Sequence, residues 1–339
     1  MTRSVLVPAA AVPLLQELAP GRFAPVAYTF RPPTRRDLWL RRLGRAVPER
    51  LVLSASPDAL ATVDALWLGG DVELPEPNTE QLLARLPNLA WVYSQRTGID
   101  HLPLDCYRRR GISVSNSGTL TARWVAEMCV ACLVGEVKQL PAHRRLQDRH
   151  RFQALWARDF TGLHVLVIGT GAIGAETSRL CRGLGMRVTG ASRNPGRFAA
   201  APHDYDAVVD LGDALTTTVR EADAMVLALP QAPETIGLVS EGVLERMPPG
   251  AMLINLARPR LVDERALLRG LHRGRPGAAY VSRTETLGWR ERLAADRLPN
   301  FHLTHVSEAH VPDKQHLAFT QFVELSDRQQ AGDVGNRVV

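Results

Sequence analysis

Residues 165–180 read VLVIGTGAIGAETSRL, and this stretch decides the fold. An apolar run leads directly into Gly169-x-Gly171-x-x-Gly174, and the glycines open a segment with helical spacing. In this setting the first glycine permits a tight turn, the second lets the backbone approach a pyrophosphate, and the third allows the helix to pack closely on the strand. The free N–H groups at the helix N-terminus then face the anion. The stretch predicts a dinucleotide-binding unit; the alternative is a plain tight turn between a strand and a helix.

The residues after the next strand indicate which dinucleotide is bound. In VTGASRNPGR (188–197), Arg193 follows Gly174 by 19 residues, where an acidic residue would bind the ribose diol. Ser192 and Arg193 stand in place of that acid, with Arg197 close behind. A guanidinium and a hydroxyl complement a phosphate on the 2′ oxygen, so we predict that NADP(H) is preferred over NAD(H). An ordinary exposed arginine after a strand is the alternative.

Strand and helix patterns alternate along the chain. After the strand 164–169, the helix 172–185 and the strand 186–192, apolar runs of strand length follow at 224–230 and 251–257. The first hundred residues repeat this pattern more loosely, with strand candidates in SVLVP, VAYTF, DALWLGG and LAWVYS. Such alternation predicts an α/β protein with doubly wound parallel sheets. A length of 339 residues suits two domains.

The composition is that of a soluble globular protein. Hydrophobic residues make up 45% of the chain, and no apolar run approaches the length of a membrane span. The first 21 residues could imitate a secretory signal, but they fit a strand followed by a helix better. The net charge of +6 comes almost wholly from arginine. Its densest cluster, RRDLWLRRLGR (35–45), is expected to be a solvated amphipathic helix rather than a nucleic-acid or membrane surface.

The four cysteines predict core packing rather than a metal or redox site. Cys129 and Cys132 have C-x-x-C spacing, but they lie inside an apolar helical pattern with no second Cys/His pair nearby. Cys106 and Cys181 suggest no disulfide framework. We therefore expect a reducing, cytoplasmic compartment and no bound metal.

Six segments, in order, resemble the D-isomer-specific 2-hydroxyacid dehydrogenase family, in its NADP-type, glyoxylate/hydroxypyruvate reductase-like form. Besides the glycine-rich stretch they are LPNLAWVYSQRTGIDHLPLD (86–105), ISVSNSGTLTARWVAEMCVACL (112–133), LALPQAPETIGLV (227–239), MLINLARPRLVDERALLRGL (252–271) and the terminal GDVGNRVV. The resemblance covers nearly the whole chain. It implies that a Rossmann-type dinucleotide-binding domain, 101–307, is inserted into a smaller flavodoxin-like α/β substrate domain made of 1–100 and 308–339. It also implies a cleft between the domains and a homodimer, with 144–162 similar to the family's dimer arm.

The resemblance assigns an arginine to the centre of the chemistry. Arg258, in NLARPR, matches the family arginine that clamps the substrate carboxylate and polarises the 2-oxo group. The family has glycine at the next position, where this chain has Pro259. Because a proline pushes the preceding residue toward extended backbone angles, we expect Arg258 to aim its guanidinium differently from the family arginine.

The proton donor and its partner depart further from the family pattern. Glu285 matches the glutamate that holds the catalytic histidine charged, after a slip of one residue. The aspartate that would hold the nicotinamide carboxamide is replaced by Val281 or Ser282. The family's Thr-Pro before the histidine is absent from NFHLTHVSEAH (300–310). We take His305 as the proton donor, and His302 and His310 are the alternatives.

The resemblance and the glycine-rich motif together imply a set of binding residues. The cofactor would be bound by Thr97, Gly169, Gly171, Ala172, Ile173, Gly174, Ser192, Arg193, Leu229, Pro230, Leu256 and Arg258. The substrate would be bound by Arg96, Thr97, Gly98, Ile99 and Arg258. Arg96 would add a positive charge for a second acidic group on the substrate, unless it faces solvent.

Two functions from different classes fit these residues. The first is an NADPH-dependent oxidoreductase that transfers hydride to the 2-oxo group of a small carboxylic acid, giving a D-2-hydroxy acid, with a specialised biosynthetic substrate as one possibility. The second is a dinucleotide-binding scaffold or regulatory protein of the same fold whose catalysis is weakened. Retention of Arg258 favours the enzyme, while Pro259 and the missing aspartate keep the scaffold open.

Overall fold

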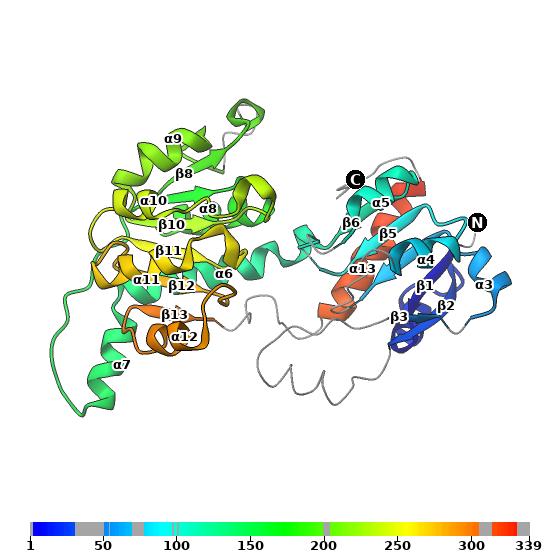
Figure 1. Cartoon of the computed structure of the whole chain (residues 1–339), viewed down its shortest axis with the longest axis horizontal. Coiled ribbons are helices and arrows are strands. Elements are labelled where there is room, and N and C mark those ends of the chain that lie inside the picture. Colours follow the sequence, from blue (N-terminus) through cyan, green and yellow to red (C-terminus); the bar gives the residue numbers. More distant parts are fainter. Residues whose placement is uncertain are drawn as a thin grey trace. The chain divides into compact units, whose positions relative to one another are not determined.

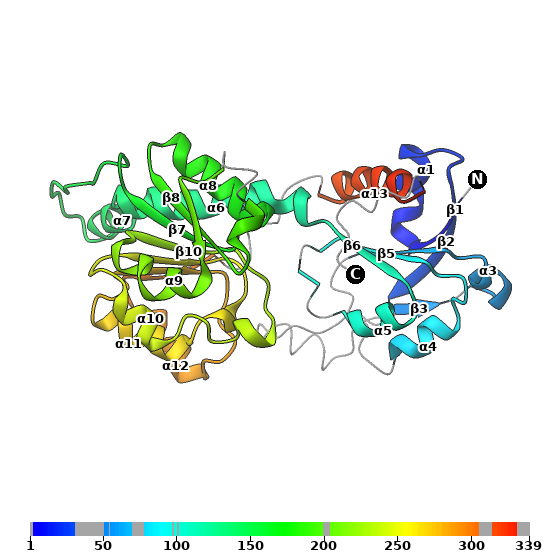
Figure 2. The same ribbon diagram turned by 90° about the horizontal axis from the view of Figure 1, so that it is seen from above.

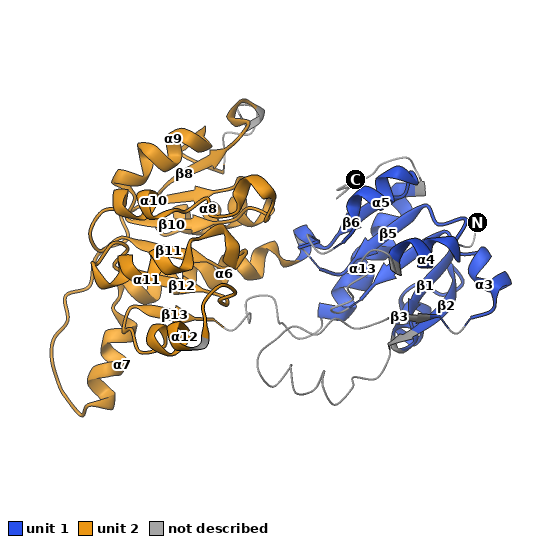
Figure 3. Cartoon of the chain, viewed as in Figure 1, with its two compact units in different colours: residues 1–120, 312–339 blue, residues 121–311 orange. Residues whose placement is uncertain are grey.

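The computed structural model of the chain describes residues 3–30, 51–53, 55–69, 78–96, 98–99, 102–198, 204–304 and 314–330. The chain divides into two compact units, residues 1–120 with 312–339 and residues 121–311 (Figure 3). The arginine-rich segment 35–45 and the terminal GDVGNRVV lie outside the described residues. Within the described part, no helix is both long and apolar enough to cross a bilayer.

The first unit is a six-stranded sheet covered by helices on both faces (Figure 1). Its strands are β1 (Arg3–Pro8), β2 (Phe23–Phe30), β3 (Leu51–Leu53), β4 (Ala65–Leu68), β5 (Trp91–Ser94) and β6 (Ser113–Asn116). Its helices are α1 (Val12–Leu18), α3 (Pro57–Ala61), α4 (Asn78–Ala84), α5 (Leu104–Arg109) and α13 (Lys314–Gln330). The order β3-β2-β1-β4-β5-β6, with only β3 antiparallel, contains the flavodoxin-like arrangement expected from the sequence.

Each face of this sheet has its own core. Helices α1 and α13 cover one face and α3, α4 and α5 cover the other, as Figure 2 shows. Alternation along β4 explains the two layers, because Leu66 packs with the second group of helices and Trp67 with α13. Trp67 stacks on Phe319 at a ring-centroid distance of 3.6 Å, so the C-terminal helix is fixed to the N-terminal sheet.

The second unit is a seven-stranded parallel sheet. Its strands are β7 (His164–Ile168), β8 (Arg187–Ser192), β9 (Ala207–Asp210), β10 (Ala224–Leu227), β11 (Met252–Asn255), β12 (Ala278–Val281) and β13 (Phe301–Leu303). Its helices are α6 (Gly118–Val137, which begins at the end of the first unit), α7 (Leu140–Asp148), α8 (Ala172–Gly183), α9 (Leu211–Thr216), α10 (Glu241–Arg246), α11 (Glu264–His272) and α12 (Trp289–Ala295). The order β13-β12-β11-β10-β7-β8-β9 is the Rossmann order with one strand added, so the doubly wound fold predicted from the alternation of strands and helices is confirmed.

Most residues in the strands of this sheet are apolar because both faces of the sheet are buried. In β7, Val165 and Val167 pack toward α6 and α8, while Leu166 and Ile168 pack toward α9, α10 and α11 (Figure 2). The layer with α6 also takes in Cys129 and Cys132, whose side chains are buried. The C-x-x-C pair is therefore core packing, as predicted from its apolar helix.

The chain passes between the two units at 120/121 and again at 311/312. The sequence-based boundary at 100/101 placed Ser113–Asn116 in the dinucleotide-binding domain. In the structure this segment is β6, which pairs with β5 at the edge of the first sheet. The segment is short and half polar, so its pattern alone did not reveal to which sheet it belongs.

Candidate functional site

The carboxyl ends of the parallel strands in the second unit gather most of the predicted site residues. Because all seven strands run the same way, the segments that follow them leave the sheet at one edge. The segments at this edge are Gly169–Gly174 after β7, Arg193 after β8, Leu229–Pro230 after β10, Leu256–Arg258 after β11, Glu285 after β12 and Thr304 after β13. The strand order reverses between β7 and β10, where ligands of doubly wound sheets bind.

The glycine-rich turn has the geometry that a pyrophosphate requires. Gly169 has a φ of +104°, and a Cβ there would lie 2.4 Å from the Ala228 carbonyl oxygen. A Cβ on Gly174 would lie 2.0 Å from the Gly169 carbonyl oxygen, so the first and third glycines are required by packing. Gly171 differs, because a Cβ there would meet nothing within 4 Å. The second glycine therefore leaves open space at the exposed side of the turn.

Helix α8 begins directly behind this open space. Gly171 is its N-cap, with an extended backbone (φ −76°, ψ −170°), and no side chain caps the helix. The N–H groups of Ala172, Ile173 and Gly174 precede the first helical hydrogen bond, which Ala175 donates to the Gly171 carbonyl at 2.9 Å. An uncapped N-terminus of a 12-residue helix carries unsatisfied donors and positive dipole charge. The turn thus fits the pyrophosphate of a dinucleotide.

Ser192 and Arg193 lie at the end of β8, beside the glycine-rich turn. The strand β8 pairs with β7, and Ala191 lies opposite Ile168. The Ser192 hydroxyl accepts a hydrogen bond from the Asn194 N–H at 3.1 Å, which closes the turn after the strand. Arg193 is exposed, and within the described part of the chain no carboxylate pairs with its guanidinium. Arg197, by contrast, is not described beyond its backbone.

Arg258 stands at the end of β11 in the extended backbone predicted from Pro259. Its φ and ψ are −138° and 131°, and Pro259 is buried at the start of a short 3-10 helix, Pro259–Leu261. Asn255 donates from Nδ2 to the Arg258 carbonyl at 2.8 Å, which fixes the backbone of this turn. One guanidinium nitrogen, Nη1, donates to the Ala257 carbonyl at 2.9 Å. The half-buried side chain is thereby held close to the strand end.

Glu285 lies in a loop that a second carboxylate holds in place. The side chain of Glu285 is partly exposed and pairs with Arg283 at 2.8 Å. Its backbone N–H donates to Glu264, which is 6% exposed, at 2.9 Å. The same carboxylate accepts from the N–H groups of Thr286 at 2.6 Å and Leu287 at 3.2 Å, and from the Thr286 hydroxyl. Glu264 is in the first turn of α11, where the helix dipole favours its charge.

Glu264 was missed by sequence reasoning. It belongs to the quoted stretch RPRLVDERALL, where it looks like an ordinary acidic residue in the first turn of a helix. Its partners are 21 to 23 positions away, so no local pattern points to them. The signal in the sequence was that Glu264 occupies a position that, by helical spacing, lies on the same face as the apolar residues of this segment.

Of the three candidate histidines, the structure describes His302. Its ring stacks on Tyr280 at a centroid distance of 4.5 Å, on the sheet face that α6 covers. Its Nε2 is 3.9 Å from a carboxylate oxygen of Glu136, which also accepts a hydrogen bond from the Tyr280 hydroxyl at 2.8 Å. Burial lowers the pKa of His302, although the Glu136 charge opposes this shift. His302 is therefore engaged under α6, whereas His305 and His310 lie outside the described residues.

The remaining predicted residues fall into two groups. At the strand edge, Leu229 is half-buried and Pro230 exposed, while the Leu256 side chain is 5% exposed and belongs to the core under α6. In the first unit, Arg96 donates its N–H to the Ser94 hydroxyl at 3.2 Å, Gly98 is half-buried and Ile99 packs in the core of that unit. Thr97 lies outside the described residues. No group of three potential metal ligands occurs within the described ranges.

A comparison with known families agrees with this geometry. Residues 130–306 match the family model described as "D-isomer specific 2-hydroxyacid dehydrogenase, NAD binding domain". The chain belongs to this family. The resemblance inferred from six sequence segments is thus confirmed, and the matched residues contain every strand of the parallel sheet and the glycine-rich turn.

Individual relatives have low sequence identity to this chain. A glyoxylate/hydroxypyruvate reductase of Arabidopsis thaliana is 29% identical over 211 residues, which cover 60% of this chain and 62% of that protein. A D-3-phosphoglycerate dehydrogenase of Mycobacterium tuberculosis is 30% identical over 207 residues, covering 59% of this chain and 37% of that protein. Both alignments span less than two thirds of the relative's own length.

Solved structures match over the whole chain. A D-isomer-specific 2-hydroxyacid dehydrogenase of Xanthobacter autotrophicus Py2, in complex with NADPH and MES, superposes with a TM-score of 0.75 at 23% identity, covering 100% of this chain and 98% of that one. A D-lactate dehydrogenase of Aquifex aeolicus, complexed with NAD and lactic acid, gives 0.70 at 22% identity and covers 99% of each chain. At these identities the likeness establishes the fold.

Proposed function

We propose that this protein is an NADPH-dependent reductase that converts a small 2-oxo carboxylic acid to its D-2-hydroxy acid. The observation that carries the proposal is that two binding features lie at the same edge of the seven-stranded sheet. The glycine-rich turn with its uncapped helix follows β7, and Arg258 follows β11. The first suits a dinucleotide and the second suits a carboxylate with a carbonyl beside it. Family membership supports a dehydrogenase of this kind.

In this proposal the chain supplies charge and a proton. The bound cofactor supplies a hydride to the carbonyl carbon. Arg258 binds the substrate carboxylate and polarises the 2-oxo group, so that negative charge developing on the oxygen is stabilised. His305 gives its proton to that oxygen, and Glu285 keeps the imidazole charged and oriented. Glu264 holds the backbone on which Glu285 is placed, which makes it a positioning residue.

The choice of cofactor and substrate rests on two arginines. Arg193 is exposed at the end of β8 with no carboxylate partner in the described part, which supports binding of a 2′-phosphate. Arg96, together with the backbone at Thr97, Gly98 and Ile99, would bind the substrate and favour one with a second acidic group. A dicarboxylic 2-oxo acid is therefore expected to have a lower KM than a monocarboxylic one, and Arg96→Ala should remove the difference.

The location and assembly of the protein are proposed from its side chains. All four cysteines are free and buried, which is consistent with a reducing, cytoplasmic compartment. Phe152 and Trp156, in the segment that resembles the family's dimer arm, are 104% and 90% exposed. Large apolar side chains so exposed favour a protein partner, and a second copy of the chain is the partner that we propose.

The decisive experiment is a measurement of NADPH oxidation with a panel of 2-oxo acids. We expect turnover with at least one acid, and a loss of about 10²–10⁴-fold in kcat for His305→Ala, the usual effect of removing a general acid. His302→Ala and His310→Ala serve as matched controls. Tight NADPH binding without turnover of any acid would support the alternative, a dinucleotide-binding scaffold. Loss of activity in His310→Ala alone would reassign the proton donor.

A further inference from the structure

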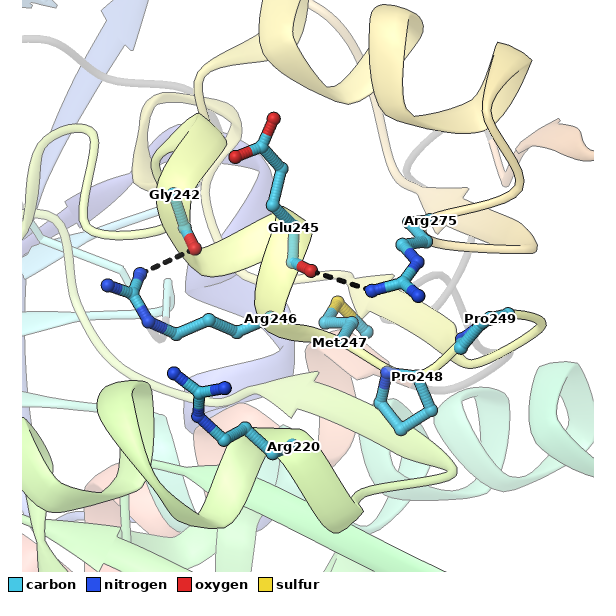
Figure 4. Close-up of a pocket in the computed structure, with 8 residues that line it drawn as sticks. All are labelled: Arg220, Gly242, Glu245, Arg246, Met247, Pro248, Pro249 and Arg275. Carbon is cyan, nitrogen blue, oxygen red and sulfur yellow. Dashed lines mark hydrogen bonds between the residues drawn. The ribbon is translucent and has the colours of Figure 1, made fainter.

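A pocket lies at the edge of the seven-stranded sheet opposite to the glycine-rich turn. It has a volume of about 540 Å³, and its charged lining residues are Arg220, Arg246, Arg275 and Glu245 (Figure 4). Arg220 is in the 3-10 helix Thr218–Glu221 that leads into β10, and Arg275 is in the loop that leads into β12. Residues 247–249, between α10 and β11, form the wall between them. Since these segments precede parallel strands, the pocket is at the amino-terminal edge, whereas the glycine-rich turn and Arg258 are at the carboxyl-terminal edge.

Backbone carbonyl groups hold the three guanidinium groups in place. Arg220 donates from Nε to the Thr216 carbonyl at 2.9 Å, and Arg246 donates from Nη1 to the Gly242 carbonyl at 2.5 Å. Arg275 donates from Nη1 to the Glu245 carbonyl at 3.0 Å. Figure 4 shows the last two of these bonds. Each bond uses one of the five N–H donors of a guanidinium, so most of the donors remain available.

The charges of these three arginines are not balanced by acidic side chains. Within the described residues, none of the three forms an ion pair with a carboxylate. Glu245 is the acidic residue of the lining, but its carboxylate is 3.5 Å from Arg273 and points away from Arg246 in Figure 4. Neighbouring arginines behave differently, since Arg269 and Arg273 both pair with Glu241, at 2.8 and 2.7 Å. The arginines that line the pocket therefore keep their positive charge unpaired by carboxylates in the described residues, whereas the neighbouring Arg269 and Arg273 are paired with Glu241.

We propose that this pocket binds the phosphate group of a small molecule. Three guanidinium groups from three different segments line the pocket. In Figure 4 those of Arg220 and Arg246 lie on one side of Met247 and that of Arg275 lies on the other. The planar fork of each arginine matches the oxygens of a phosphate. The volume lies within the range of about 300–1,000 Å³ that is usual for small-molecule sites, and it is larger than one phosphate group needs. Pro248 and Pro249 offer an apolar wall for the organic part of the ligand.

The test is calorimetric titration of the purified protein at constant ionic strength with inorganic phosphate, pyrophosphate and glycerol 3-phosphate. The variant Arg220→Gln/Arg246→Gln/Arg275→Gln is compared with Arg144→Gln/Arg179→Gln/Arg265→Gln, which removes the same charge from exposed, carboxylate-paired arginines of the same unit. We expect the pocket variant to bind glycerol 3-phosphate at least tenfold more weakly than the wild type, and the control to bind it like the wild type. Any binding at the glycine-rich turn is common to all three proteins and cancels in the comparison.

Three outcomes would overturn the proposal. They are equal affinity in the pocket variant and the control, no phosphate binding by the wild type at millimolar concentrations, and weaker binding of glycerol 3-phosphate than of inorganic phosphate, which would indicate a site for a free ion. Because a triple variant can lose stability, the single variant Arg275→Gln is measured as well. Its side chain is exposed, so it should keep the wild-type Tm and still bind at least threefold more weakly. Unchanged affinity in Arg275→Gln would also contradict the proposal.

Discussion

At Arg193, one side chain is expected to decide between two cofactors. Its guanidinium is exposed at the end of β8, and a charge-assisted hydrogen bond to a phosphate contributes about 1.5–3 kcal/mol. Arg193→Gln should therefore weaken NADP(H) binding at least tenfold and leave NAD(H) binding unchanged, measured by fluorescence titration of both cofactors. Arg179→Gln, which removes an exposed arginine from α8, is the control. Equal loss of affinity for both cofactors would contradict the specific role of Arg193.

At Glu264, a buried carboxylate is expected to stabilise the loop that contains Glu285. It accepts hydrogen bonds from three successive backbone N–H groups and one hydroxyl. Glu264→Gln removes the charge from these bonds and should lower the free energy of unfolding by about 1.5–3 kcal/mol in urea denaturation. It should also lower kcat more than it raises KM, since the loop and not the substrate loses its support. Glu291→Gln is the control, because this more exposed carboxylate accepts a hydrogen bond only from the nearby N–H of Gly288 among the backbone donors of the described residues. An equal loss of stability and of kcat in Glu291→Gln would contradict the specific role of Glu264.

At the level of elements, the turn between β7 and α8 contains one glycine that is expected to matter for folding, Gly174, and another that is expected to matter for cofactor binding, Gly171. A methyl group on Gly174 would collide with the Gly169 carbonyl, whereas one on Gly171 meets open space. We expect Gly174→Ala to lower the free energy of unfolding by about 1–3 kcal/mol, as overpacking does. Gly171→Ala should fold like the wild type and bind either cofactor at least tenfold more weakly. Thermal unfolding and cofactor titration check both; unchanged cofactor affinity in Gly171→Ala would mean that no pyrophosphate approaches this glycine.

The same elements show what the sequence could and could not predict. The unit from β7 to β8 was predictable because its glycine spacing, strand and helix are local patterns, and the extended backbone of Arg258 followed from Pro259 alone. The support of Glu285 by Glu264 was not predictable, since it joins the start of α11 to a loop after β12. The engagement of His302 under α6 depends on Tyr280 and Glu136, which are also distant in sequence. Long-range packing, rather than propensity, decides these contacts.

For the whole molecule, one buried and one half-buried histidine predict how stability depends on pH. Burial lowers the pKa of both His164 and His302, and Arg187 and Arg145, respectively, act in the same direction. Below a pH of about 6.5 the unfolded chain binds protons that the folded chain excludes, so the free energy of unfolding should fall as the pH is lowered. His302→Phe keeps a ring against Tyr280 but cannot titrate, so it should make this fall shallower. Urea denaturation between about pH 5 and pH 7.5 measures the slope, and an identical slope would exclude His302 as a contributor.

The assembly of the whole molecule is expected to depend on the segment after α7. Phe152 and Trp156 are almost fully exposed there, at 104% and 90%, and burying each such side chain contributes roughly 1.5–3 kcal/mol. If two copies of the chain bury these side chains against each other, Phe152→Ser/Trp156→Ser should convert a dimer to a monomer in sedimentation velocity at micromolar concentration. Ile236→Ser/Leu293→Ser alters two apolar side chains that are 44% and 48% exposed elsewhere in the same unit, and should leave the dimer intact. A wild-type protein that sediments as a monomer would refute the proposed homodimer, whereas a dimer that survives the first variant would place its interface on another surface.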